Sequence, residues 1–149
     1  MRHADNSDLL TPSLQNDSTM AVYSVGALIA AAFFGGGVAV VIMGTLNAYR
    51  LGRLGRDAIL LIGMLLLSVG TLVAMIEMTA GGDTARTARL VNRGLGFVLC
   101  GALYLLHQRA FKAMNFLGLD KPSPYVPVIA AIVVSILVTM GVFAALEVG

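Results

Sequence analysis

Residues 20–46 read MAVYSVGALIAAAFFGGGVAVVIMGTL, a run of 27 residues that contains no charged side chain. A helix of about 20 apolar residues crosses the hydrocarbon core of a bilayer, so this run predicts a transmembrane helix. Three more apolar stretches follow at 58–76, 94–106 and 126–146. Because lipid offers the backbone no water to bond with, these stretches stay helical, and they predict an all-α integral membrane protein, a four-transmembrane-helix bundle of two helical hairpins.

The composition of the whole chain indicates the same fold class. Hydrophobic residues make up 58% of the sequence and charged residues only 12%, whereas a soluble domain carries about 25% charged residues. The formal net charge of +2 is too small to indicate a nucleic-acid partner. The 149 residues predict one membrane domain at 20–149, preceded by a flexible polar tail at 1–19 that lacks an apolar period.

Within this domain the sequence predicts helices at about 20–48, 58–77, 88–107 and 126–146, and an interfacial segment at 108–119. The third apolar stretch has only 13 residues, a length that fits either a crossing or a re-entrant segment. Arg93 can extend its side chain back to the headgroups, which lengthens this stretch to 88–107 and favours a crossing.

Small residues spaced four apart predict where the helices pack, because they let two helix backbones touch in lipid. The predicted packing residues are Ala31, Ala32, Gly35, Gly36, Gly63, Gly70, Ala131 and Ser135. Two other interpretations of Gly35-Gly36-Gly37 stay open: a kink or re-entrant break, and an unwound segment that faces a ligand. The hydroxyls of Ser135 and Thr139 are expected to bond carbonyls of their own helix.

Basic residues flank the apolar stretches and predict contacts with anionic lipid headgroups, each worth about 1 kcal/mol. They are Arg50, Arg53, Arg56, Arg86, Arg89, Arg93, Arg109 and Lys112. A specific phosphorylated ligand or an acidic partner is the alternative, since guanidinium forks match phosphate oxygens. The Lys and Arg count beside the helices predicts that linkers 49–57 and 108–124 are cytoplasmic and, with four crossings, that both termini are outside.

No pattern typical of catalysis appears. The sequence has no nucleophile elbow, P-loop or His/Cys ligand set, so we expect no enzyme activity, no metal and no cofactor. His107 is expected at the membrane interface, with a proton relay as the alternative. A salt bridge between Glu77 and Arg93 is expected because both should lie at the same membrane face. The apolar stretches hold no acidic residue near mid-membrane, which an ion pump or coupled transporter usually needs.

The first span carries two short motifs, Phe33-Phe34-Gly35-Gly36-Gly37 and then Asn47-Ala48-Tyr49-Arg50-Leu51-Gly52-Arg53. They resemble small bacterial multi-pass membrane proteins of unknown function that carry Phe-Phe-Gly-Gly-Pro followed by Asn-Tyr-Arg-x-Leu-Gly. Gly37 stands where that pattern has proline, and Ala48 is an insertion. The resemblance covers about a quarter of the chain; it implies a bacterial inner-membrane location and no particular mechanism.

From these features we expect a non-enzymatic small integral membrane protein that acts as an interaction or accessory subunit within the bilayer. Its partners would be the lipid bilayer and its anionic headgroups, with further copies in a homo-oligomer or with a larger membrane complex. The alternative is a small oligomeric transporter or channel, whose flux would depend on Asn47, Asn92 or Arg93.

Overall fold

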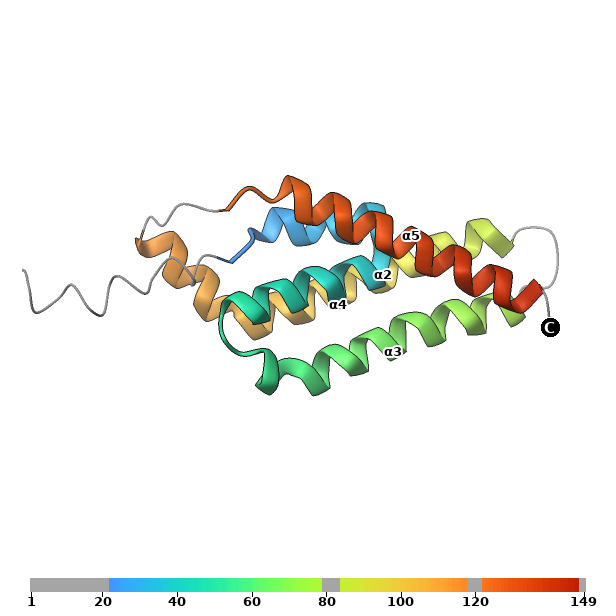
Figure 1. Ribbon diagram of the computed structural model, residues 1–149, viewed down its shortest axis with the longest axis horizontal. Coiled ribbons are helices and arrows are strands. Elements are labelled where there is room, and N and C mark those ends of the chain that lie inside the picture. The colour runs from blue at the N-terminus through green and yellow to red at the C-terminus, as the bar shows by residue number, and fades with distance from the viewer. Residues whose placement is uncertain (1–21, 79–83, 118–121, 148–149) are drawn as a thin grey trace, which may run out of the picture.

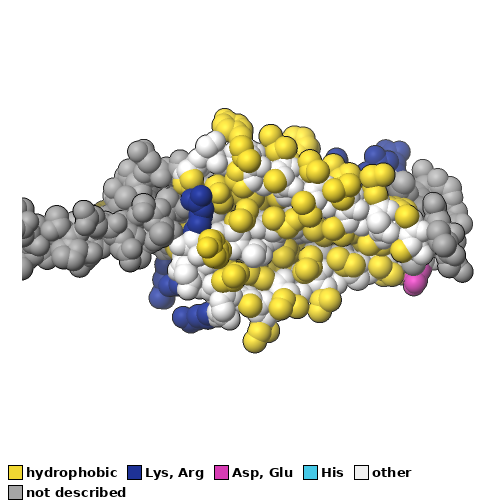
Figure 2. Space-filling view, in the orientation of Figure 1, with side chains coloured by type: hydrophobic (Ala, Val, Ile, Leu, Met, Phe, Trp, Pro, Cys, Tyr) yellow, Lys and Arg dark blue, Asp and Glu magenta, His cyan; other side chains and the backbone are white. Residues whose placement is uncertain are grey.

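A computed structural model describes residues 22–78, 84–117 and 122–147 of the chain. These residues form four α-helices and no strand: α2 Val25–Arg50, α3 Leu54–Met78, α4 Thr84–Leu117 and α5 Tyr125–Glu147. Each helix is long and apolar enough to cross a membrane. Hydrophobic side chains cover the body of the bundle, and Lys and Arg gather near its two ends (Figure 2). The predicted all-α four-helix membrane bundle is confirmed, and the predicted tail at 1–19 lies outside the described residues.

Local sequence signals explain where the helices begin and end. Ser24 is the N-cap of α2, and its Oγ accepts a hydrogen bond from the Ala27 N–H. Gly52 follows α2 with φ +63°, a conformation that glycine adopts without a steric cost. Pro124 precedes α5, and its carbonyl accepts the Val128 N–H at 3.0 Å. The linker from α2 to α3 is therefore very short, as the sequence predicted for the first hairpin.

The α2 helix doubles back on itself at Gly36. The backbone there is non-helical, with φ 69° and ψ −155°. A straight helix would separate Tyr23 from Asn47 by about 36 Å, at 1.5 Å per residue. Instead, the Tyr23 N–H donates to Asn47 Oδ1 at 2.8 Å, and the Arg50 guanidinium lies 4.5 Å from the Tyr23 ring centroid. Both ends of α2 therefore meet at one end of the bundle (Figure 1).

The other three helices surround this folded helix and run the full length of the bundle (Figure 1). Buried α2 residues number 15 of 26, against 4 of 25 in α3. Along the long axis, α3 and α5 run in one direction and α4 runs in the other. We call the end where α3 and α5 begin and α4 terminates the basic end, because it carries Arg50, Arg53, Arg56, Arg109 and Lys112. The opposite end is the far end.

The structure corrects two expectations about the helices. The segment that re-enters is part of the first span, whereas the short third stretch lies in the longest helix, α4. Residues 108–117 continue α4, so they are not a separate interfacial helix; 118–119 lie outside the described residues.

Candidate functional site

The tip of α2, residues 34–37, is the most unusual backbone in the bundle. Gly36 adopts a φ/ψ combination that is essentially restricted to glycine. A Cβ placed on Gly36 would lie 2.6 Å from Cγ of Asn92, so the missing side chain also makes room for its neighbour on α4. Gly96, one turn further along α4, approaches just as closely, and a Cβ there would lie 2.9 Å from the Gly36 carbonyl carbon. The tip therefore requires glycine both for its conformation and for its packing.

Side chains from two other helices satisfy the backbone groups that the break exposes. The Gly37 N–H donates to Asn92 Oδ1 of α4 at 3.1 Å. The Ser135 hydroxyl of α5 donates to the Gly35 carbonyl. Unpaired backbone groups inside a bilayer cost several kcal/mol each, so irregular backbone survives there only with such partners or beside water. Asn92 and Ser135 thus position the break.

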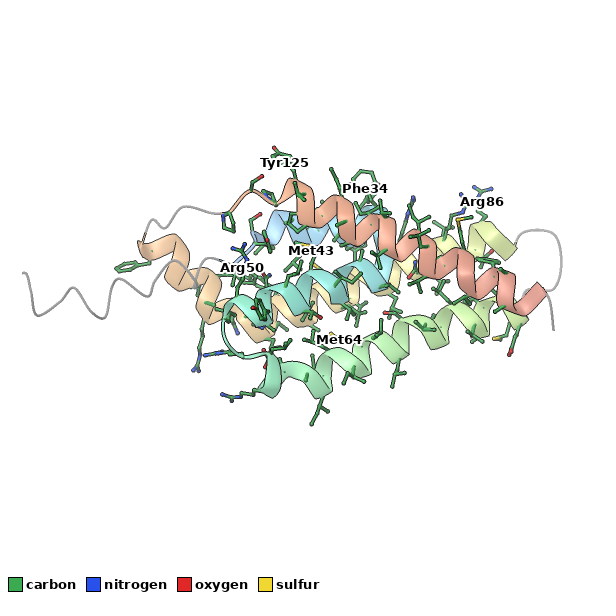
Figure 3. All side chains as sticks on the ribbon, viewed as in Figure 1. Phe34, Met43, Arg50, Met64, Arg86 and Tyr125 are labelled. Atoms are coloured by element: carbon green, nitrogen blue, oxygen red, sulfur yellow. The ribbon has the colours of Figure 1, made fainter. Side chains whose placement is uncertain are left out.

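The tip ends part-way along the bundle. Its contacts with Ser68, Asn92 and Ser135 show how far each surrounding helix continues beyond it. From these residues to the helix ends at the far end there are roughly 8–12 residues, or about 12–18 Å of helix. Figure 3 agrees, because Phe34 lies about midway between Tyr125 near the basic end and Arg86 near the far end. Beyond the tip, α2 no longer fills the space between its neighbours.

A cleft of about 210 Å³ opens beside the tip and extends toward the far end. Its lining comes from α2, α4 and α5: Phe34, Gly35, Gly36, Arg89, Asn92, Arg93, Ser135, Ile136, Thr139 and Met140. The described residues that line it include no Asp or Glu. Two guanidinium groups one helical turn apart, an amide and two hydroxyl-bearing residues therefore surround a space at mid-depth in the bundle. The guanidinium groups offer hydrogen-bond donors and positive charge to an anion, whereas the hydroxyls of Ser135 and Thr139 already donate to carbonyls.

The two arginines of the cleft have different surroundings. The Arg93 guanidinium lies 5.3 Å from the Phe33 ring centroid, a cation–π distance, and forms no ion pair with Glu77 among the described residues. The expected Glu77–Arg93 salt bridge is therefore wrong. Both arginines are exposed, and Arg89 lies one turn closer to the far end. The second half of α2 begins at Gly37. The positive end of its helix dipole therefore lies at the tip, beside the cleft.

Six of the eight predicted packing residues face the interior. Ala31, Ala32 and Ala131 are fully buried, Ser135 is 1% exposed, and the close contacts of Gly35 and Gly36 are with α5 and α4. Gly63 and Gly70 were expected to contact the first helix, but a Cβ on either would have no atom within 4 Å. The residue of α3 that meets α2 there is Ser68, whose Cβ would lie 3.1 Å from a Cβ on Gly37.

The hydroxyl prediction holds for one residue and fails for the other. Thr139 donates to the Ser135 carbonyl at 2.8 Å, one turn back on its own helix. Ser135 instead reaches across to α2. The difference reflects where the two residues lie, because Ser135 is opposite the break at Gly36 and Thr139 is one turn further along α5.

A second polar cluster lies near the basic end, and the sequence did not predict it. His107 is 1% exposed, not interfacial, and its Nε2 lies 3.2 Å from Asp57 Oδ2, which joins α4 to the first turn of α3. Asp57 was missed because it follows an arginine-rich linker. Its spacing could have revealed it, since the buried residues of α3 are Asp57, Leu61, Ser68 and Leu72, all on one helical face.

The remaining predicted headgroup residues lie outside the cleft. Arg53, Arg56, Arg109 and Lys112 are exposed near the basic end, while Arg86 is exposed near the far end. Among the described residues no group of three or more His, Cys, Asp or Glu side chains could hold a metal ion. The chain matches no protein-family model, and comparisons with characterised proteins and with solved structures give no match.

Proposed function

We propose that this protein is a small anion transporter or channel, with the cleft at the tip of α2 as its anion-binding site. The observation that carries the proposal is a break in a membrane helix at mid-depth, beside a cleft that Arg89 and Arg93 line. Intramembrane charges are costly and mark ion or substrate pathways. Half-helices whose N-termini point at an anion are one way in which membrane proteins bind such substrates.

The charge balance of the cleft supports an anion as the occupant. Arg89 and Arg93 are four residues apart on one helix, a spacing at which like charges repel. An anion held between the two guanidinium groups would relieve this repulsion and accept several charge-assisted hydrogen bonds. The alternative is that both side chains extend to lipid headgroups at the far end.

Flux through liposomes tests the proposal. The purified protein would be reconstituted, and efflux of chloride and uptake of inorganic phosphate would be measured in separate experiments. Arg93→Gln and Arg89→Gln are expected to lower the flux of the transported anion by about tenfold or more, because losing a charged hydrogen bond costs roughly 1.5–3 kcal/mol. Arg86→Gln is the matched control, since Arg86 is exposed on the same helix and does not line the cleft.

Two outcomes would contradict the proposal. One is that neither anion crosses the membrane faster with the protein than without it. The other is that Arg86→Gln lowers flux as much as the cleft variants do, because a general loss of positive charge near the far end would then explain the effect. Anion-dependent thermal stabilisation of the protein in nanodiscs gives an independent measure of binding.

We further propose a bacterial inner-membrane location with the basic end in the cytoplasm. Among the described residues, five basic residues at this end, against three at the far end, support it through the positive-inside tendency. Linkers 49–57 and 108–124 would then be cytoplasmic, and Arg50, Arg53, Arg56, Arg109 and Lys112 would contact anionic headgroups. Since α2 doubles back, the start of α2 would be cytoplasmic and the end of α5 outside. A cysteine at Ser24 should then resist membrane-impermeant reagents applied from outside.

An interaction or accessory subunit is the second candidate function. It is favoured by the outer face of α3, where Gly63 and Gly70 have no neighbour within the chain. Small residues on a lipid-facing surface allow close approach of another helix, either from a second copy or from a larger complex. Purification in native nanodiscs with mass spectrometry would identify a stoichiometric partner. Loss of that partner in Gly63→Leu, with flux absent in the wild-type protein, would favour this function. Both proposed functions are non-enzymatic.

A further inference from the structure

Asp57 and His107 form a titratable pair inside the bundle, about a turn from the start of α3. The distance between His107 Nε2 and Asp57 Oδ2 is 3.2 Å, and the two side chains are 1% and 9% exposed. One turn deeper, a Cβ on Gly44 of α2 would touch both Leu103 of α4 and Leu61 of α3. The pair therefore sits where α2, α3 and α4 converge, and it is separate from the cleft at the tip.

The pair has unused hydrogen-bonding capacity around it. His107 Nδ1 is buried and has no hydrogen-bond partner among the described residues. The same holds for Asn47 Nδ2, on the part of α2 one turn beyond Gly44. Buried polar groups almost always have partners, and an unpaired one costs free energy. Such groups beside an acid and a base mark a place where a proton can be bound or relayed.

Among the described residues, the other buried titratable side chains are Tyr23 and Cys100. On α2, Arg50 lies over the Tyr23 ring. On α3 and α4, the neighbouring charged residues Arg53, Arg56, Arg109 and Lys112 are all exposed, as is Tyr125 at the start of α5. Among the described residues the buried polar and charged side chains are Asn47, Asp57, Ser68, His107 and Ser135. Of these five, Asp57 and His107 are the two with an ionisable side chain.

We propose that Asp57 and His107 form a proton-binding site that holds one proton between them and fastens α3 to α4. With one proton the pair is neutral overall, whether the proton sits on the carboxylate or on the imidazole. Uptake of a second proton from water at the basic end leaves an imidazolium beside a neutral acid. Loss of the proton leaves a carboxylate beside a neutral imidazole. Each of these states puts an uncompensated charge in a buried position, which is strongly unfavourable.

The consequence is a contact between α3 and α4 that depends on pH. Apart from Asp57, only three of the 25 residues of α3 are buried, so the helix makes few other contacts with the bundle interior. Separating the pair would let water reach the charged member and would move the start of α3 away from α4. This inference goes beyond anion binding and does not depend on it, because no residue of the pair lines the cleft.

Nuclear magnetic resonance of the imidazole nitrogens tests the site directly. The full-length protein would carry ¹⁵N-labelled histidine and be titrated in nanodiscs from about pH 3 to about pH 8, a range that covers the ordinary titration of both side chain types. His3→Gln identifies the His107 signals, since the sequence contains two histidines. We expect Asp57→Asn to shift the His107 titration midpoint by one pH unit or more. An unchanged midpoint in Asp57→Asn would overturn the proposal.

A distance measurement tests the mechanical consequence. Spin labels would be placed on Ile59→Cys of α3 and Leu105→Cys of α4, two exposed positions beside the pair, in a Cys100→Ala background. The distance is expected to lengthen as the pH falls in the otherwise wild-type protein. It should stay constant in Asp57→Asn/His107→Gln, which keeps a hydrogen bond and cannot titrate in this range. The same pH response in both proteins would show that other groups cause it and would overturn the proposal.

Discussion

The α2 and α3 helices look alike in sequence but differ in where they lie in the bundle. Both are apolar helices of about equal length, and both contain glycines. Yet α2 is folded in two at the centre of the bundle, whereas α3 lies at the outside with its glycines facing open space. Hydropathy indicates only that a helix is apolar enough to lie in lipid. What distinguishes the two helices is whether partners for a broken backbone exist on the neighbouring helices.

Those partners come from far along the chain. Asn92 is 55 residues from Gly37, and Ser135 is 100 residues from Gly35. α3 has no equivalent pair of side chains beside Gly63 or Gly70, and its hydroxyls on Ser68 and Thr71 bond carbonyls of their own helix. A glycine becomes a break where a neighbouring helix supplies the missing hydrogen bonds, and otherwise it stays inside a regular helix.

The largest expected effect comes from adding one methyl group to the tip. Gly36→Ala should destabilise the protein by about 2–4 kcal/mol, because alanine is strained at this φ/ψ and its Cβ would collide with Asn92. Gly63→Ala, the matched change in α3, should alter stability by less than about 0.5 kcal/mol or raise it slightly. Thermal or denaturant unfolding in detergent micelles measures both. Equal losses for the two variants would remove the distinction between the helices.

Much of this fold follows from the sequence, but the break does not. The membrane class, the four helices and the inward position of Ala31, Ala32 and Ala131 follow from apolar run length and small-residue spacing. Three consecutive glycines fit a close helix contact as well as a break, and the sequence favoured the contact. Choosing between them needs the positions of Asn92 and Ser135 relative to the tip, which only the tertiary structure supplies.

The sequence also identified some residues of the candidate site, but not their role. Arg89 and Arg93 stood out as basic residues beside an apolar stretch, and the sequence assigned them to lipid headgroups. Their place in a cleft depends on α2 ending part-way along the bundle, which leaves space beside α4 and α5. Asp57 and His107 were separated by 50 residues and looked like ordinary interfacial residues, so their pairing could not be read from local pattern.

Asn92→Leu should produce the next largest effect. The substitution is close in volume and removes the acceptor of the Gly37 N–H, which leaves that donor unpaired at mid-depth. An expected loss of about 1–3 kcal/mol follows from the cost of an unsatisfied buried group. Thr71→Val in α3 is the control, because its hydroxyl bonds only its own helix. If Asn92→Leu unfolds at the same temperature as the wild-type protein, Asn92 does not hold the break.

Ser135→Ala should have the smallest effect of the three. It removes the hydroxyl that donates to the Gly35 carbonyl, a group with two lone pairs that tolerates under-satisfaction better than an N–H does. We expect a loss of about 1 kcal/mol. Thr139→Val, one turn along the same helix, should change stability by less, since Thr139 bonds a carbonyl of α5 itself. A larger loss from Thr139→Val would mean that α5 holds α2 through other contacts.

The distance between the two ends of α2 tests the central claim most directly. Spin labels on Gly26→Cys and Tyr49→Cys, both exposed positions, would be measured by pulsed electron paramagnetic resonance in a Cys100→Ala background. A helix folded at Gly36 places these backbones on the order of 10 Å apart, the spacing of packed helices. A straight helix of the same sequence would place them about 35 Å apart and would contradict both the break and the cleft that depends on it.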